Sequence, residues 1–373
     1  MKILINGFSA KTGGGKSILN NYLKLLSKKG GDHQYIVIVP YVEAYMKFES
    51  CFIEIVGFSN KYQSAFILPY TYNILIPKFV KSRKVDVIFN LADIPIKSNI
   101  KQIFLFDWAY AVYPDSLAWK RMNKRDLLKR RAKMFFFKRN IKYIDACIAQ
   151  NEIIKERLEK IFALQKVVCI NNAVSLDNHK SASEVKVDFP IPDGVKLLYL
   201  TYYYSHKNLE IFLDLARLIR EKQSDFKLVI TIDKSHGPNA EKFLDVVKDE
   251  KLEDIIINIG PVKMEHVPSL YQQCDALLMP TLLESFSGTY VEAMYHELPI
   301  ITSDLDFAKI VCKNAAVYFN PIDEMDIFAK ILLVFNSQSE FKNELVQRGK
   351  ERLNEFHNWN QVFEKYQNLI LNL

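Results

Sequence analysis

Two glutamates and the small residues between them form the part of the sequence best suited to chemistry. Glu284 and Glu292 are separated by seven residues, and the second glutamate falls in a segment of helical composition. A carboxylate before a helix and another on its second turn can both face a ligand whose phosphates rest on the helix N-terminus. They would accept hydrogen bonds from sugar hydroxyls. The residues we expect at such a ligand are Glu284, Ser285, Phe286, Ser287, Gly288, Thr289 and Glu292.

A glycine-rich stretch at residues 11–17 is a second candidate for anion binding. It follows an expected strand and opens an expected helix, the context in which backbone amides approach a phosphate. The phosphate-loop pattern of nucleoside triphosphatases is missed at one position, because Ala10 stands where that pattern has glycine. A nucleoside triphosphatase is therefore a less favoured alternative. The stretch is either a tight structural turn or a place where Gly14 and Gly15 let the backbone approach a donor or acceptor.

Charge is unevenly distributed along the chain, whose formal net charge is +7. Residues 1–180 carry 30 basic and 14 acidic side chains, whereas residues 181–373 carry 20 and 29. Residues 120–142 hold eleven Lys or Arg and one acid, interleaved with bulky apolar residues. This composition is typical of a helix on an anionic membrane surface, and a solvated helix is the ordinary alternative. The cations we expect at a membrane or acceptor surface are Lys124, Arg125, Lys129, Arg130, Arg131 and Lys133.

Short apolar runs that alternate with amphipathic segments predict the elements that must position these residues. The expected strands are residues 2–6, 35–39, 85–89, 102–106, 144–149, 167–171, 196–201, 226–232, 255–259, 275–279, 299–302 and 316–319. Such alternation indicates parallel sheets covered by helices on both faces. The polar stretch 175–195 lacks either periodicity and marks a domain boundary. We therefore predict an α/β fold of two doubly wound domains that face a central ligand cleft.

Several motifs, found in order along nearly the whole chain, resemble one family. The run ESFSGTYVEAM, preceded by YQQCDALLMPTLLE and followed by LPIITSD, resembles the donor-site signature of the retaining glycosyltransferases of family 4, or glycosyl transferases group 1. The segment Ser205–Leu209 resembles the family's phosphate-binding segment, and Gly13–Gly15 resembles its N-terminal glycine loop. The family's GT-B fold implies an acceptor-binding Rossmann-like domain of residues 1–178 and a nucleotide-sugar-binding one of residues 190–355. A C-terminal helix, residues 356–373, would pack back on the first domain.

The resemblance also implies roles for single residues. Glu292 would bind the ribose hydroxyls of the donor, Glu284 the transferred sugar and Lys207 the diphosphate. His206 would contact the donor as well, although a solvent-facing position is the alternative for it. Asp107 matches the family's acceptor-side aspartate and is our third catalytic candidate. A lysine and a helix N-terminus can stabilise a leaving diphosphate without a metal, so no metal or other cofactor is expected.

Three positions depart from the family's pattern. Tyr202 stands where many members carry an arginine that supplies a second cation. Phe106 stands where members often carry a histidine near the acceptor, and Glu297 replaces the usual small residue before LPII. These departures leave open a catalytically silent protein of the same fold that acts as a binding partner or scaffold.

Cysteine usage and the N-terminal residues bear on the compartment. The five cysteines lie far apart without a Cys-x-x-Cys pair, and the chain starts on a strand-like segment rather than a signal peptide. We therefore expect a cytoplasmic protein, or one bound at the inner face of the membrane. The predicted activity is a hexosyl- or N-acetylhexosaminyl-transferase that moves a sugar from a nucleotide-diphosphate sugar to a glycan or lipid-linked saccharide in cell-surface polysaccharide synthesis. No nucleic-acid-reading motif is present in the sequence, so nucleic acid is not an expected partner.

Overall fold

The computed structural model describes residues 1–11, 13–64, 66–174, 176, 187–336 and 339–373. The chain divides into two compact units. The first comprises Met1–Pro114, Met122–Asn172 and His357–Leu373, and the second comprises Asp115–Arg121 and Ala173–Phe356. Residue 178, where we expect the first domain to end, and most of the predicted boundary stretch lie outside the described residues.

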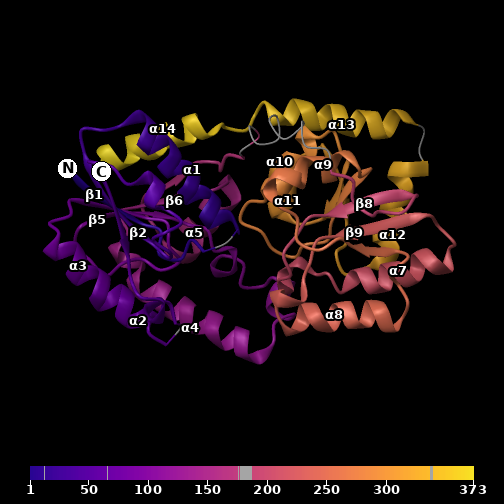
Figure 1. Ribbon diagram of the computed structural model, residues 1–373, viewed down its shortest axis with the longest axis horizontal. Helices are drawn as coiled ribbons and strands as arrows, with labels where there is room; N and C mark the ends of the chain where they lie inside the picture. Colours follow the sequence, from indigo (N-terminus) through magenta and orange to yellow (C-terminus); the bar gives the residue numbers. More distant parts are fainter. Residues whose placement is uncertain (12, 65, 175, 177–186, 337–338) are drawn as a thin grey trace. The chain divides into compact units, whose positions relative to one another are not determined.

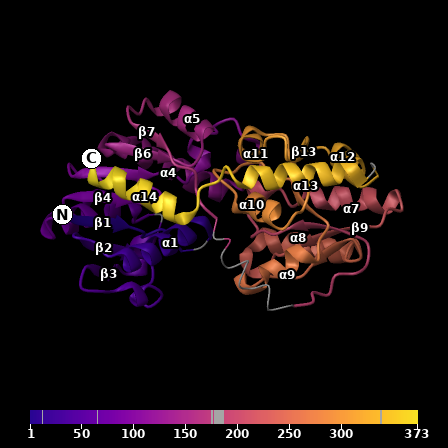
Figure 2. The same ribbon diagram turned by 90° about the horizontal axis from the view of Figure 1, so that it is seen from above.

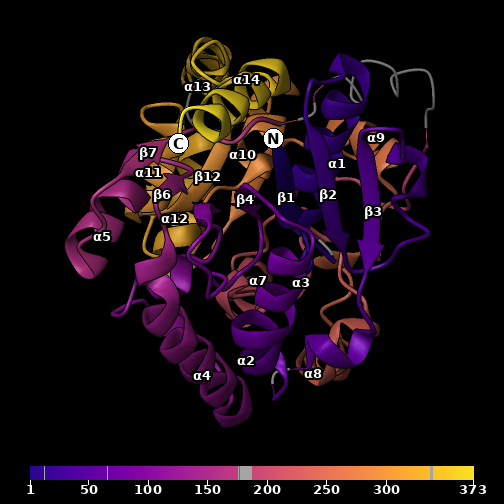
Figure 3. The same cartoon turned by 90° about the vertical axis from the view of Figure 1, so that its left-hand side faces the viewer.

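The first unit contains a parallel sheet of seven strands in the order β3-β2-β1-β4-β5-β6-β7. These strands are β1 (Lys2–Asn6), β2 (Gln34–Val39), β3 (Ile53–Gly57), β4 (Val87–Asn90), β5 (Lys101–Leu105), β6 (Ala146–Ala149) and β7 (Val167–Cys169). The apolar runs predict every one of them except β3. Figure 3 shows β3 beside β2, at the edge of the sheet, where an exposed Glu54 alternates with buried Ile53 and Ile55. An edge strand with one exposed face lacks the continuous apolar run that marks a central parallel strand.

The helices of the first unit include the last helix of the chain. They are α1 (Gly13–Lys29), α2 (Leu68–Tyr70), a π-helical turn η3 (Thr71–Leu75), α3 (Ile76–Ser82), α4 (Lys124–Asn140), α5 (Glu152–Phe162) and α14 (Trp359–Leu371). In Figure 1, α14 lies against α1. The ring of Tyr22 is 5.2 Å from that of Phe363, and Lys29 pairs with Glu364 at 2.9 Å. The end of the chain therefore completes the core of the first unit.

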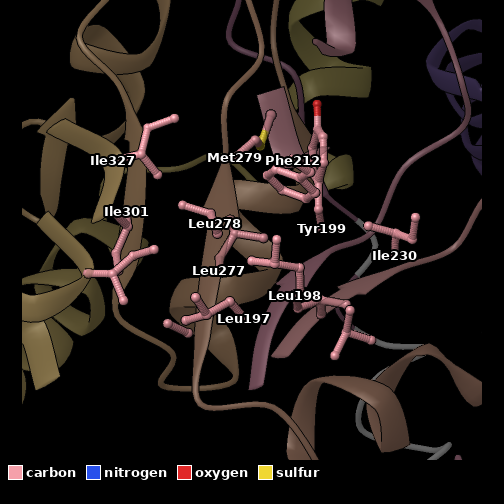
Figure 4. Packing of buried hydrophobic residues seen from close by; sticks show 14 of the residues in the cluster. Leu197, Leu198, Tyr199, Phe212, Ile230, Leu277, Leu278, Met279, Ile301 and Ile327 are labelled. Atoms are coloured by element: carbon pink, nitrogen blue, oxygen red, sulfur yellow. The ribbon is translucent and has the colours of Figure 1, made fainter. Parts of the chain in front are cut away.

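The second unit contains a parallel sheet of six strands in the order β10-β9-β8-β11-β12-β13. These strands are β8 (Val195–Tyr199), β9 (Phe226–Ile230), β10 (Ile256–Asn258), β11 (Ala276–Met279), β12 (Ile300–Ser303) and β13 (Ala316–Phe319). The order reverses between β8 and β11, whose leucines pack at the centre of the core in Figure 4. Parallel α/β sheets bind ligands at the carboxyl ends of the strands beside such a reversal. The two parallel sheets confirm the predicted fold class.

Helices cover both faces of this second sheet. They are α7 (Ile211–Glu221), α8 (Pro238–Asp249), α9 (Val267–Gln272), α10 (Gly288–Tyr295), α11 (Asp306–Cys312), α12 (Glu324–Asn336) and α13 (Ser339–Leu353). Because crossovers between parallel strands are right-handed, α7 and α8 lie on one face, and α9, α10 and α11 lie on the other. Helix α12 packs against α7, and α13 packs against α10, as Figure 2 shows. Among the described residues, no helix is both long and apolar enough to cross a bilayer.

Three short 3₁₀ helices complete the carboxyl edge of the second sheet. They are η5 (Leu117–Trp119), η8 (Ser205–Lys207) and η9 (Lys234–His236). Helix η5 lies in the segment Asp115–Arg121 and packs against η8. The hydroxyl of Ser116 donates to the carbonyl of Leu282 at 3.2 Å. A short piece from the first half of the sequence thus supports the loops that follow β8 and β11.

Candidate functional site

An ion pair lies where β8 and β11 end. Lys207 is the last residue of η8, which follows β8, and Glu284 lies in the loop after β11. The Nζ atom of Lys207 is 2.6 Å from Oε1 of Glu284, and the two side chains are 16% and 12% exposed. Two residues that are far apart in the sequence therefore meet at the reversal point of the sheet.

Neighbouring residues fix the geometry of this pair. Tyr199 donates its hydroxyl to the carbonyl of Lys207 at 2.9 Å, and Thr281 donates to Oε1 of Glu284 at 3.0 Å. The amide of Asn208 donates to the carbonyls of Pro280 and Pro321 at 3.1 and 2.7 Å. Asn208 is fully buried and has a φ of 57°, a left-handed conformation that asparagine tolerates better than most residues. The loops after three strands are thus tied together behind the ion pair.

Helix α10 brings the second predicted glutamate to the same edge. It begins at Gly288, and the side chain of its N-cap residue, Ser287, makes no capping hydrogen bond to the first-turn amides. The start of a helix is a place where backbone amides can bind an anion. Glu292, on the second turn, accepts a hydrogen bond from the hydroxyl of Tyr271 at 2.9 Å. Burial raises the pKa of Glu292, although the hydrogen bond from Tyr271 opposes this shift. Burial also raises the pKa of Tyr271, so its phenol stays a neutral donor.

The other predicted donor contacts have different environments. Ser285, Phe286 and Thr289 are partly exposed, whereas Ser287 is buried at the start of α10. The ring of Phe286 packs edge-on against Phe356 at 6.3 Å, which gives it a structural role as well. The carbonyl of His206 accepts hydrogen bonds from the amide of Leu282 and the hydroxyl of Thr281, so this residue joins the two loops through its backbone.

Two of the predicted residues of the first unit, Gly15 and Asp107, line a pocket in that unit. Asp107 follows β5, and its Oδ1 accepts a hydrogen bond from the amide of Gln150 at 2.9 Å. Gly14 lies beside this carboxylate, because a Cβ on Gly14 would stand 3.9 Å from Oδ2 of Asp107. The pocket has a volume of about 130 Å³ and is lined by Ser9, Ala10, Gly15, Leu91, Ala92, Asp93, Phe104, Leu105, Asp107 and Trp108. The glycine-rich stretch and Asp107 are thus neighbours, whereas Lys16 and Ser17 are exposed.

Phe106 is fully buried and packs against Phe137, with ring centroids 6.0 Å apart. The position at which the resemblance implies a histidine therefore belongs to the hydrophobic core of this chain.

The predicted cations of α4 divide into two groups. Lys133 pairs with Asp93 at 2.7 Å and lies 4.4 Å from the ring of Trp108, and both of these partners line the pocket. Burial lowers the pKa of Lys133. Arg130 lies over the ring of Tyr110 at 4.0 Å. Lys124, Arg125, Lys129 and Arg131 are exposed on the same helix, although Lys129 pairs with Asp126 at 3.4 Å.

Sequence reasoning missed four of these residues. Asp93 comes shortly after a predicted strand, as Asp107 does, and this position could have identified it. Gln150 and Thr281 also follow strands, but an amide and a hydroxyl are too common there to stand out. No feature of the sequence marks Tyr271 as a site residue, because its hydrogen bond to Glu292 depends on how α9 packs beside α10.

Comparisons with known proteins show which family part of the chain is similar to and which folds it shares. Residues 183–352 match the model of the family described as glycosyl transferases group 1. The O-antigen chain mannosyltransferase RfbU of Salmonella typhimurium is 24% identical over 233 residues, which span 62% of this chain and 59% of that protein's length. The structure of Anabaena HepE in complex with UDP-glucose matches with a TM-score of 0.72 and 13% identity over 100% of both chains.

A second solved structure, that of WaaG, is described as a glycosyltransferase involved in lipopolysaccharide biosynthesis. It matches with a TM-score of 0.70 and 13% identity over 99% of each chain. At this level of identity the structural matches show the fold. Residues 183–352, which include Lys207, Glu284 and Glu292, are thus similar to the glycosyl transferases group 1 family, and the two Rossmann-like units have the GT-B fold.

Proposed function

We propose that this protein is a retaining glycosyltransferase that moves a hexosyl or N-acetylhexosaminyl group from a nucleotide-diphosphate sugar to a glycan or lipid-linked saccharide. The observation that carries the proposal is the Lys207–Glu284 pair in the loops that precede α7 and α10, with the start of α10 four residues after Glu284. An ammonium group has three donors, so Lys207 can serve Glu284 and a phosphate oxygen together. The pair thus places a cation and a hydroxyl acceptor within reach of one bound sugar diphosphate.

In the proposed reaction, the bond between the anomeric carbon and the diphosphate oxygen breaks, and negative charge grows on the leaving diphosphate. Lys207 and the first-turn amides of α10 stabilise that charge in the transition state. Glu284 accepts a hydrogen bond from the transferred sugar, and Glu292 accepts those of the ribose hydroxyls. The acceptor hydroxyl attacks the face from which the diphosphate departs, so the configuration is retained. Its proton passes to the departing phosphate oxygen, and no metal or other cofactor takes part.

The similar proteins support the choice of substrates. HepE was solved with UDP-glucose, RfbU is an O-antigen chain mannosyltransferase, and WaaG is involved in lipopolysaccharide biosynthesis. We therefore propose a nucleotide sugar as the donor substrate of this chain and cell-surface polysaccharide synthesis as its role. Asp107 and its pocket in the first unit are the place we propose for an acceptor group. The family match favours the transferase over the nucleoside triphosphatase alternative.

A membrane-facing surface of the first unit is the second part of the proposal, with the cytoplasmic face of the membrane as its location. Leu128 and Phe135 on α4 are 70% and 59% exposed among the cations of that helix. Three apolar side chains near α2, each four residues from the next, are also exposed: Phe66 at 96%, Tyr70 at 45% and Ile74 at 41%. Phe136 packs into the cluster that includes Tyr72 and Ile76, and Figures 1 and 3 show α2 near α4. Exposed apolar side chains among cations suit an anionic bilayer.

Vesicle sedimentation tests the membrane-facing surface. The protein should sediment with vesicles that contain phosphatidylglycerol more than with neutral phosphatidylcholine vesicles, and salt should weaken the binding. The variant Leu128→Ser/Phe135→Ser should bind less without a change in thermal stability, because both side chains are exposed in the free protein. Equal sedimentation of the variant and the wild type, or no binding at low salt, would contradict this part of the proposal.

Donor turnover tests the reaction itself. Purified protein is screened for hydrolysis or transfer of a panel of nucleotide-diphosphate sugars, and Lys207→Ala should reduce the rate by about 10²- to 10³-fold. Lys227 on β9 is a matched control, because its side chain is also 16% exposed and pairs with Asp225 at 3.1 Å away from the site. Lys227→Ala should keep the wild-type rate. Binding of a donor without turnover would instead identify a silent binding protein, and Mg²⁺-dependent ATP binding that Lys16→Ala abolishes would identify a nucleoside triphosphatase.

A further inference from the structure

We propose that Arg121 binds the diphosphate of the donor and acts as a second cation, with Lys207, when that diphosphate leaves. This role rests on the proposed function, because the ligand is the diphosphate of the proposed donor. Arg121 ends the segment Asp115–Arg121, which belongs to the second unit although the chain on both sides of it belongs to the first. We call this segment the strap.

The Lys207–Glu284 pair by itself carries no net charge. Nζ of Lys207 lies 2.6 Å from a carboxylate oxygen of Glu284, so the positive charge of the site is already balanced before a ligand binds. A diphosphate brings negative charge on both phosphates, and more negative charge develops on it as the sugar leaves. Residues 200–206, which follow β8, include no Lys or Arg. A further cation from another segment would therefore stabilise the transition state.

The strap is fixed against the two loops that carry the pair. Its 3₁₀ helix η5 packs against η8, whose last residue is Lys207. The hydroxyl of Ser116 donates to the carbonyl of Leu282 and accepts from the amide of Ala118, both at 3.2 Å. The amide of Leu282 in turn donates to the carbonyl of His206 at 2.7 Å. The strap, the loop after β11 and η8 are therefore joined by hydrogen bonds and packing.

The side chain of Arg121 is exposed and available to a ligand. Burial raises the pKa of Tyr203, and the charge of Arg121 opposes that rise, so this guanidinium acts on a residue two positions before η8. Among the residues that the structure describes, the guanidinium forms no ion pair and no hydrogen bond. All five of its N–H donors are therefore free to bind phosphate oxygens.

Two other cations at the carboxyl edge of the second sheet already have acidic partners. Lys234 in η9 pairs with Asp245 at 2.9 Å, and Lys309 in α11 pairs with Asp304, which follows β12. Arginine also suits the ligand better than lysine, because its planar fork can bind two phosphate oxygens at once. Arg121 thus combines an unpaired charge, a place on the strap and a geometry that fits a diphosphate.

Calorimetric titration and single-turnover kinetics test this role. UDP, GDP and ADP are the probes, and the one that the wild type binds most tightly is titrated into each variant. Arg121→Ala should bind it about tenfold more weakly, because charge-assisted hydrogen bonds to phosphate are lost. Its rate of donor turnover at saturation should fall by about 10²-fold. Arg121→Lys keeps the charge without the fork and should lie between Arg121→Ala and the wild type.

Two variants that each remove one positive charge are the matched controls. Lys120→Ala removes the neighbouring exposed cation of the strap. Lys248→Ala removes an exposed cation from the last turn of α8, where that helix has run back toward the amino ends of the strands. Both should keep the affinity and the rate of the wild type within about twofold, because salt screens charges that do not touch the ligand. Arg121→Ala should also keep the wild-type Tm, since its side chain is exposed and unpaired.

Each other outcome is decisive. Wild-type affinity and rate in Arg121→Ala would overturn this role and leave the proposed function in place. An equal loss in Lys120→Ala would overturn it as well, because the general charge of the strap would then matter rather than one contact. A lower Tm of Arg121→Ala would mean that Arg121 acts through folding. Diphosphate binding that depends on Arg121 in a protein that turns over no donor would support the binding site and overturn the proposed function.

Discussion

Removal of the Lys207 cation should separate its role in catalysis from its role in stability. In the variant Lys207→Met, the carboxylate of Glu284 remains in a site where its side chain is only 12% exposed. Breaking a fully buried ion pair by deleting one partner costs about 3–5 kcal/mol. Because both side chains keep some contact with water, we expect a loss of about 1–3 kcal/mol in the free energy of unfolding. The rate of donor turnover should fall by about 10²- to 10³-fold.

The second variant, Lys207→Met/Glu284→Gln, removes the unpaired charge as well. Its free energy of unfolding should return to within about 1 kcal/mol of the wild type, because neutral groups of similar size replace the ion pair. The turnover rate should stay low, since the double variant lacks both the cation that stabilises the leaving diphosphate and the carboxylate that contacts the transferred sugar. Denaturant unfolding measures the stability of each variant, and a single-turnover assay with saturating donor measures the chemical step.

Two results would refute this reasoning. Turnover in the double variant that recovers along with stability would mean that Lys207 acts only through folding. An unchanged stability of Lys207→Met would mean that the pair is not formed in solution. Glu284→Gln alone completes the double-mutant cycle and gives the coupling energy between the two residues.

Three further predictions concern other parts of the chain. Burial raises the pKa of Glu292 in the folded protein above its value in the unfolded chain. The free energy of unfolding therefore falls as the pH rises from the unfolded to the folded pKa value. Above that interval Glu292→Gln should have a higher Tm than the wild type in thermal unfolding. The same variant should bind UDP about tenfold more weakly by calorimetry, since a charged acceptor of the ribose hydroxyls is lost, and equal affinity would remove Glu292 from the site. Phe137→Ala should lower the free energy of unfolding by about 3–5 kcal/mol because Phe137 is fully buried among aromatic rings, whereas Phe135→Ala should change it by about 0.5 kcal/mol or less. Glu297 has a φ of 60°, a left-handed conformation that glycine adopts without strain. Glu297→Gly should therefore raise the free energy of unfolding by about 1 kcal/mol, although it removes the exposed pair with Lys350. A lower denaturation midpoint than that of the wild type would show that this pair outweighs the backbone strain.

The sequence predicts the two parallel sheets because central strands of such sheets are continuous apolar runs. It does not predict β3, since an edge strand exposes Glu54 and lacks that signal. Glu297 shows a similar limit: the resemblance implies a small residue at this position, but the left-handed backbone there is visible only in the structure.

Part of the candidate site is also beyond sequence reasoning. The resemblance of the motifs around Lys207, Glu284 and Glu292 to one family predicts that these residues act together. Tyr271 reaches Glu292 only through the packing of two helices. Lys133 appears in the sequence as one cation of a basic run, yet it lies against Asp93 and Trp108 because burial of Phe137 sets which face of α4 packs inward. Charge composition alone does not indicate that face.

The structure of the protein with a bound nucleotide-diphosphate sugar, the donor with the highest affinity in the turnover panel, tests the central claim most directly. The account predicts that the diphosphate lies within hydrogen-bonding distance of Nζ of Lys207 and of the amides that open α10 at Gly288. It also predicts that Glu284 contacts the transferred sugar and Glu292 the ribose. A diphosphate bound instead at the glycine-rich stretch 13–15, or a sugar that contacts neither glutamate, would contradict it.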